Sequence, residues 1–279
     1  IRGFDIHGQE SYFYLRILNY ILNNEFPSYD FLRFGGRAFL YSIGSTLFLV
    51  SLNMLLRISI INLLTFIPII FGFFSVVLLY LILRKFKVTR NTLSFICYLF
   101  ILSPVFLHSF THFTSFTIPF FLNILGFYFI TKEKKIFGYL AFIIYIMLSF
   151  FEFVHILFGL TLMFFYFWKI GKLKRFVPYS FVILLVLYLN NHFVHFGISV
   201  MNYKIQEYFF IFGGEYGLSI FIIFLSLFGM FYLWKEKYKN SFYYFFILIS
   251  VIMLVFNLKY IIYVALVMSV LGAYGLKYL

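Results

Sequence analysis

The sequence has few charged residues, and the acidic ones are the scarcest. Of its 279 residues, 11% are Asp, Glu, Lys or Arg, whereas 64% are hydrophobic. A soluble domain carries roughly 25% charged residues, so a soluble fold has no way to cover this much apolar surface. The composition therefore predicts an all-α, polytopic membrane protein in which lipid takes the place of water.

Cysteine is almost absent as well. The single Cys97 lies in an apolar stretch, which excludes an intrachain disulfide and a cysteine-rich metal site. The formal net charge of +13 would suggest a nucleic-acid partner in a soluble protein. In a membrane protein the positive-inside rule explains it better, so we expect no nucleic acid. The chain begins at Ile1 without a signal sequence, and we expect a first membrane helix to precede it.

Apolar runs separated by charge clusters predict about nine membrane spans, since a spanning helix needs about 20 mostly apolar residues. The expected spans are Leu64–Leu83, Asn91–Leu107, Thr117–Ile130, Ile136–Phe150, Phe153–Trp168, Phe176–Asn190, Tyr216–Trp234, Ser241–Phe256 and Tyr260–Leu276. Phe39–Leu56 is apolar too, but a full crossing there would move every basic loop outside. We therefore interpret it as a helix in the outer interface.

Positive charge occupies every second break between these spans. The basic turns contain Arg84, Lys85, Lys87 and Arg90, then Lys132, Lys134 and Lys135, then Lys169, Lys172, Lys174 and Arg175, and finally Lys235, Lys237 and Lys239. Basic loops face the cytoplasm. The chain is thus predicted to be a single transmembrane domain (1–279) of the cell membrane. Its first outer loop (1–57) and late outer loop (191–215) lie outside, and its C-terminus is cytoplasmic.

The acidic residues gather on the opposite side. Seven fall in outer segments or at an outer helix end, namely Asp5, Glu10, Glu25, Asp30, Glu152, Glu207 and Glu215. Acidic residues contribute little to topology, so this bias has another cause. One cause is solvation of the two long loops, and the other is an outward-facing site built from carboxylates.

The first outer loop holds the residues such a site would need. Asp5 and Glu10 offer oxygen ligands to a divalent cation, Mn²⁺ or Mg²⁺, which neutralises a phosphate leaving group. Arg16 and Arg37 offer planar forks for phosphate oxygens. The alternative is a capped amphipathic helix from Ser11 to Asn23, with the carboxylates merely solvated.

This loop resembles the first outer loop of the GT-C superfamily of lipid-linked glycosyltransferases, above all the catalytic subunit of archaeal oligosaccharyltransferase. The matching run is Glu10-Ser11-Tyr12-Phe13-Tyr14-Leu15-Arg16, with Glu in place of the family's usual Asp. The later Tyr29-Asp30 and Phe34-Gly35-Gly36-Arg37 also match.

The late outer loop resembles the same family. The family carries Thr-Ile-any-Glu there, and this chain has Lys204-Ile205-Gln206-Glu207. The family's second acidic motif, expected in an intervening outer loop, is missing. The corresponding segment, from Ser109 to Ser115, has His112 and hydroxyl groups but no acid.

The resemblance implies a membrane glycosyltransferase that moves a sugar or oligosaccharide from a polyprenyl-phosphate-linked donor to an acceptor at the outer face. It implies metal binding by Asp5, Glu10 and Glu207, with Asp5 or Glu10 also acting as general base. The implied donor-phosphate ligands are Arg16, Arg37, Lys204 and Lys259. The alternative is a non-catalytic membrane subunit, or a carrier of lipid-linked glycans.

Two single residues and one pair have two interpretations each. His112 is either a metal ligand or an interfacial histidine bonded to a hydroxyl. Glu152 and His155, three residues apart on one helix face, form either a functional site at membrane depth or a mutually satisfied pair. Lys259 either meets a lipid diphosphate or extends to the interface.

Overall fold

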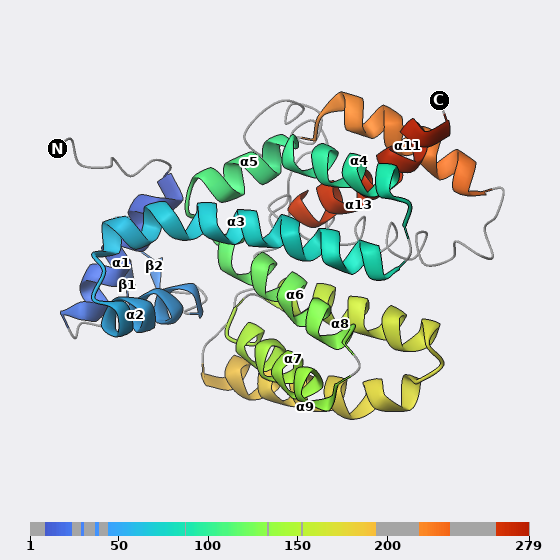
Figure 1. Ribbon diagram of the computed structural model, residues 1–279. Coiled ribbons are helices and arrows are strands. Elements are labelled where there is room, and N and C mark those ends of the chain that lie inside the picture. Colours follow the sequence, from blue (N-terminus) through green and yellow to red (C-terminus); the bar gives the residue numbers. More distant parts are fainter. Residues whose placement is uncertain are drawn as a thin grey trace. The chain divides into compact units, whose positions relative to one another are not determined.

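The described part of the chain is helical. The computed structural model describes residues 9–23, 29–30, 37–38, 44–86, 88–132, 134–151, 153–193, 218–234 and 261–278. Apart from one antiparallel pair of two-residue strands, β1 (Tyr29–Asp30) and β2 (Arg37–Ala38), the regular elements among these residues are helices (Figure 1). The predicted all-α class is thereby confirmed.

The chain divides into two compact units, which we describe separately. Unit 1 comprises residues Ile1–Phe73 and Ser109–Ile198, and unit 2 comprises Phe74–His108 and Ser199–Leu279. Unit 1 holds α1 (Gln9–Leu22), α2 (Gly44–Leu56), α6 (Thr117–Ile130), α7 (Lys135–Leu148), α8 (Phe153–Lys169) and α9 (Leu173–Phe193). Unit 2 holds α4 (Arg90–Ile101), α11 (Ile220–Trp234) and α13 (Ile261–Tyr278), while α3 (Ile60–Lys85) and α5 (Pro104–Thr111) have residues in both.

Most of the predicted spans coincide with helices. The helices α3, α6, α7, α8, α9, α11 and α13 cover seven of the nine, and α6 has the predicted limits Thr117–Ile130. The span expected at Ser241–Phe256 lies outside the described residues. By length and composition, α3 is the one described helix that could cross a membrane unaided, and α4 with α5 makes a second if their bent pair counts as one span. The number nine therefore stays a prediction.

The span predicted at Asn91–Leu107 is not one straight helix. The chain bends by 63° between α4 and α5. The cause is Ser103 followed by Pro104, because proline lacks an N–H and disfavours helical geometry in the residue before it. The Ser103 hydroxyl donates to the Phe100 carbonyl (2.7 Å) and accepts from the Phe106 N–H (3.3 Å). Ser103 thus caps α5, with proline at the first helical position.

The amphipathic helix predicted from Ser11 to Asn23 is present as α1. Ser11, Tyr14 and Leu18 are buried on one side, while Tyr12 is 57% exposed. The spacing of three and four residues places the buried side chains on one face. This face packs in the core of unit 1. The helix expected within Phe39–Leu56 is also present, as α2; its place in an outer interface stays a prediction.

Three helices of unit 1 meet around Tyr145. This fully buried side chain of α7 fits between Gly126 of α6 and Gly159 of α8. A Cβ atom at Gly126 would lie 3.0 Å from the tyrosine ring, and one at Gly159 would clash with it. Close beside them, the buried Asn123 side chain donates to the carbonyl of His155 at 3.0 Å and ties α6 to α8. Small residues and an interhelical hydrogen bond are the packing devices of membrane helices.

In unit 2, α11 and α13 approach each other closely through glycine. A Cβ atom on Gly229 would clash with the backbone carbonyl of Leu271, and one on Gly275 would clash with that of Leu225. Gly272 also lies in this contact, facing the side chain of Leu225. The two backbones can come this near only because the residues between them have no side chain.

Candidate functional site

The first turn of α1 is joined to the segment between α5 and α6. The Ser11 hydroxyl donates to the Phe113 carbonyl and accepts from the Phe113 N–H, both at 3.1 Å. The Ser115 backbone N–H donates to Glu10 Oε2 at 2.9 Å. Three hydrogen bonds therefore hold a sequence segment from the start of the chain against one about a hundred residues later. We call Glu10, Ser11, Phe113 and Ser115 the α1–loop junction.

Hydroxyl groups hold the loop side of this junction in one conformation. The Thr117 hydroxyl donates to the Ser109 carbonyl (2.9 Å) and accepts from the Thr114 N–H (3.0 Å). The Thr114 hydroxyl accepts from the Phe116 N–H (3.3 Å). Backbone N–H and C=O groups of this loop that make no hydrogen bond within a helix are thus paired with hydroxyl groups. Buried backbone groups need such partners. The N–H of Ser115 is presented to Glu10 by a loop that its own side chains fix.

Aromatic contacts accompany the hydrogen bonds. Tyr14 meets Phe113 edge to face, with ring centroids 4.9 Å apart. This geometry is one that aromatic pairs prefer. On the same helix, the guanidinium carbon of Arg16 lies 5.6 Å from the ring centroid of Phe13. Arg16, predicted to bind donor phosphate, is half-buried in this position.

The structure brings Glu10 to the very segment in which the family's second acid is missing. His112 directly precedes Phe113, so it belongs to the same loop as Ser115, the partner of Glu10. Its side chain is half-buried. The contact between these two segments is not predicted by the residues of either one alone. A signal was present in the hydroxyl-rich run from Ser109 to Thr117, because such a run between apolar helices needs partners.

Most of the other predicted site residues fall outside what the structure describes. Asp5, Glu152, Lys204, Glu207 and Lys259 lie in segments without a described position, and Arg37 is described only as part of strand β2. Within the described residues, no three side chains of His, Cys, Asp or Glu come together as a metal site. The metal site of Asp5, Glu10 and Glu207 accordingly stays a prediction.

His155 is described, and it is buried in α8 with 1% of its surface exposed. Its ring meets that of Phe116 edge to face at 5.4 Å between centroids, and its carbonyl accepts the bond from Asn123. Phe116 directly follows Ser115, so His155 packs against the loop that holds Glu10. The proposed pairing of His155 with Glu152 stays a prediction, since Glu152 lies outside the described residues.

No protein-family model matches the chain, and no curated protein is significantly similar to it. The resemblance of the segments around Glu10 and Glu207 to the GT-C superfamily therefore rests on their residues.

Proposed function

We propose that this chain is the membrane domain of a GT-C-type glycosyltransferase that takes its sugar or oligosaccharide from a polyprenyl-phosphate carrier at the outer face of the cell membrane. The observation that carries the proposal is the α1–loop junction. It holds the carboxylate of Glu10, the acid of the family-like motif, against the segment between α5 and α6.

The distribution of apolar side chains supports the membrane part of the proposal. On α11, the buried positions include Ser226 and Gly229, whereas the exposed ones are large and apolar. Their exposed fractions are 61% for Phe221, 59% for Phe224 and 74% for Phe231. A helix whose exposed positions carry phenylalanine side chains is suited to lipid rather than water. The nine-span topology deduced from the basic loops is part of this proposal.

The fixed position of Glu10 suits a role in binding the reacting groups. A carboxylate has about four acceptor sites, and the bond from Ser115 uses one of them. Negative charge and oxygen ligands are what Mn²⁺ and Mg²⁺ prefer. A divalent cation held by Glu10, with Asp5 and Glu207, would neutralise charge on the departing phosphate. Glu10 or Asp5 would accept the proton that the attacking group of the acceptor loses.

The test of this role is the thermal unfolding of purified protein in detergent, with and without MnCl₂ or MgCl₂. The wild type should be stabilised by the cation, because ligands that bind the folded state raise the unfolding temperature. Glu10→Gln should lose most of this shift while unfolding at the wild-type temperature without cation, since glutamine keeps an acceptor for Ser115. An equal cation shift in both proteins would refute metal binding by Glu10.

A non-catalytic membrane subunit or glycan carrier is the second candidate. The bond from Ser115 favours it because it gives Glu10 a structural role. The bond shows that this carboxylate fixes the loop, and a structural role of this kind requires no catalysis. In that case Glu10→Gln behaves like the wild type in every assay, including the cation titration.

A further inference from the structure

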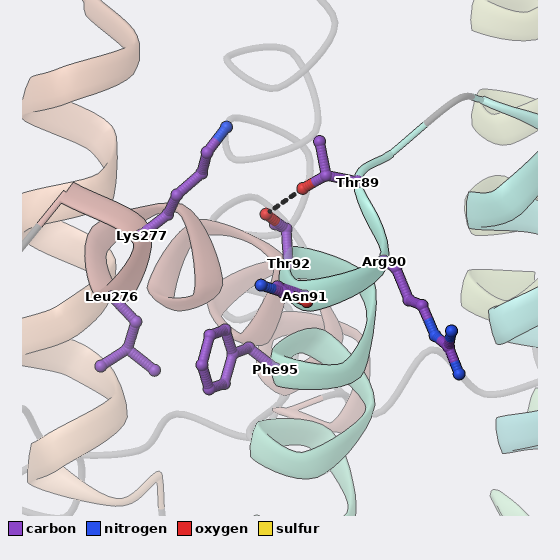
Figure 2. Close-up of a pocket in the computed structure, with 7 residues that line it drawn as sticks. All are labelled: Thr89, Arg90, Asn91, Thr92, Phe95, Leu276 and Lys277. Atoms are coloured by element: carbon purple, nitrogen blue, oxygen red, sulfur yellow. Dashed lines mark hydrogen bonds between the residues drawn. The ribbon is translucent and has the colours of Figure 1, made fainter.

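Unit 2 contains a pocket of about 420 Å³ between the start of α4 and the end of α13. Its lining residues are Thr89, Arg90, Asn91, Thr92, Phe95, Leu276 and Lys277. Figure 2 shows Lys277 and Leu276 of α13 facing Thr92, Asn91 and Phe95 of α4. Pockets of this size hold small ligands or the headgroup of a lipid.

The polar end of the pocket is suited to an anion. Lys277 lies there, and Asn91 and two threonine hydroxyls add neutral donors. The described part of unit 2 also contains Arg84, Lys85 and Arg90, and it contains no Asp or Glu. The charged side chains among these described residues are therefore all basic.

The capping of α4 adds to this preference. Thr89 precedes the helix in an extended conformation, yet it makes no side-chain capping hydrogen bond. Its hydroxyl pairs instead with that of Thr92 at 2.8 Å, the bond drawn in Figure 2. The first turn of α4, whose residues line the pocket, thus has no side-chain cap from Thr89.

The other end of the pocket is apolar and continues along a helix. Phe95 and Leu276 form this wall. Phe95, Tyr98 and Leu102 follow one another at spacings of three and four residues, and they are 41%, 63% and 67% exposed. These spacings keep them on one face of α4. A polar, cationic mouth that leads into an exposed apolar stripe matches a molecule with an anionic head and an acyl chain.

We propose that this pocket binds the phosphate headgroup of an anionic glycerophospholipid, with an acyl chain along Phe95, Tyr98 and Leu102. The proposal rests on the membrane placement given above and is independent of glycosyl transfer. The pocket is formed by the start of α4 and the end of α13. Both of these helix termini lie on the side that the basic loops predict to be cytoplasmic. Basic pockets between membrane helices on that side are known to hold anionic headgroups.

The probe is dioctanoyl phosphatidylglycerol, titrated into the purified protein in neutral detergent while thermal unfolding is followed. The phosphatidylglycerol should raise the unfolding temperature saturably. Dioctanoyl phosphatidylcholine and glycerol 3-phosphate should have no such effect, because the first lacks net negative charge and the second lacks the acyl chains. An equal response to phosphatidylcholine, or to glycerol 3-phosphate, would overturn the proposal.

Variants locate the site. Lys277→Gln should raise the half-saturating phosphatidylglycerol concentration about fivefold, the effect of about 1 kcal/mol for one basic side chain near anionic lipid. Lys169→Gln is the matched control, because Lys169 likewise lies in the last turn of an apolar helix but does not line the pocket. It should leave the titration unchanged. Equal titrations of the Lys277→Gln variant and the wild type would overturn the proposal.

Asn91→Asp provides a second variant that keeps the fold. Asn91 is exposed in the first turn of α4, where a carboxylate favours the helix. Its negative charge should nevertheless repel the phosphate and weaken phosphatidylglycerol binding at least fivefold. Wild-type binding by this variant would show that the pocket does not receive the headgroup.

Discussion

The backbone N–H of Ser115 donates a 2.9 Å hydrogen bond to the carboxylate of Glu10, although the two residues are 105 positions apart. Ser11, the neighbour of Glu10, makes two further bonds to Phe113 in the same loop. Glu10, at the start of α1, is therefore held in place by the segment from Ser109 to Ser115, which contains no acidic residue. This relationship turns two separate sequence features into one candidate site.

Ser11→Ala should destabilise the protein by about 1–3 kcal/mol, because it leaves a buried N–H and a buried carbonyl of Phe113 without their partner. The measurement is the unfolding temperature in detergent. Ser180→Ala is the control, since its exposed hydroxyl bonds only a carbonyl three residues earlier in the same helix. A loss of stability no larger for Ser11→Ala than for this control would contradict the junction.

Gly229→Ala should also destabilise, by roughly 1–3 kcal/mol, because the new methyl group clashes with the carbonyl of Leu271 and forces α11 and α13 apart. Gly138→Ala serves as the matched control. A Cβ atom there has the Tyr179 hydroxyl at 3.5 Å, an ordinary contact, and alanine is the better helix former by about 0.5–1 kcal/mol. The prediction fails if thermal unfolding ranks the two variants in the opposite order.

Two buried hydroxyl groups should respond in opposite ways to removal. The hydroxyl of Tyr145 is buried and has no hydrogen-bond partner among the residues that the structure describes, so Tyr145→Phe should leave stability unchanged or raise it. Thr117→Val removes a hydroxyl that makes bonds to Ser109 and Thr114, and it should cost about 1–3 kcal/mol. Comparison of the two unfolding temperatures checks this. A marked loss of stability in Tyr145→Phe would show that its hydroxyl is bonded after all.

The sequence predicted the local elements well where composition alone decides them. Thr117–Ile130 is a mostly apolar run that ends shortly before the basic residues Lys132, Lys134 and Lys135, and α6 has those limits. The bend between α4 and α5 was missed because Ser103 and Pro104 lie inside a run that is otherwise apolar enough for one span. Mean hydropathy measures how apolar a segment is, and it does not show where a capping serine and a proline interrupt the helix.

The candidate site was harder to predict, for a different reason. The bonds of Glu10 and Ser11 join residues more than a hundred positions apart, and no periodic pattern encodes such a pairing. By sequence alone, a plain amphipathic helix from Ser11 to Asn23 and a site built on the family-like acid are alternative interpretations. The structure shows that the helix and a fixed carboxylate exist together, since Glu10 lies in the first turn of α1.

The most direct measurement is the rate at which radioactivity passes from a radiolabelled polyprenyl-phosphate sugar to products that organic solvent does not extract together with the lipid. It compares membranes containing the wild type with membranes containing Glu10→Gln. Glutamine keeps the acceptor for Ser115, so the variant should unfold like the wild type. It should nevertheless transfer sugar at least about a hundredfold more slowly, the effect of losing a catalytic acid–base group. Equal transfer by both proteins, or none by the wild type with any such donor, would contradict the proposed function.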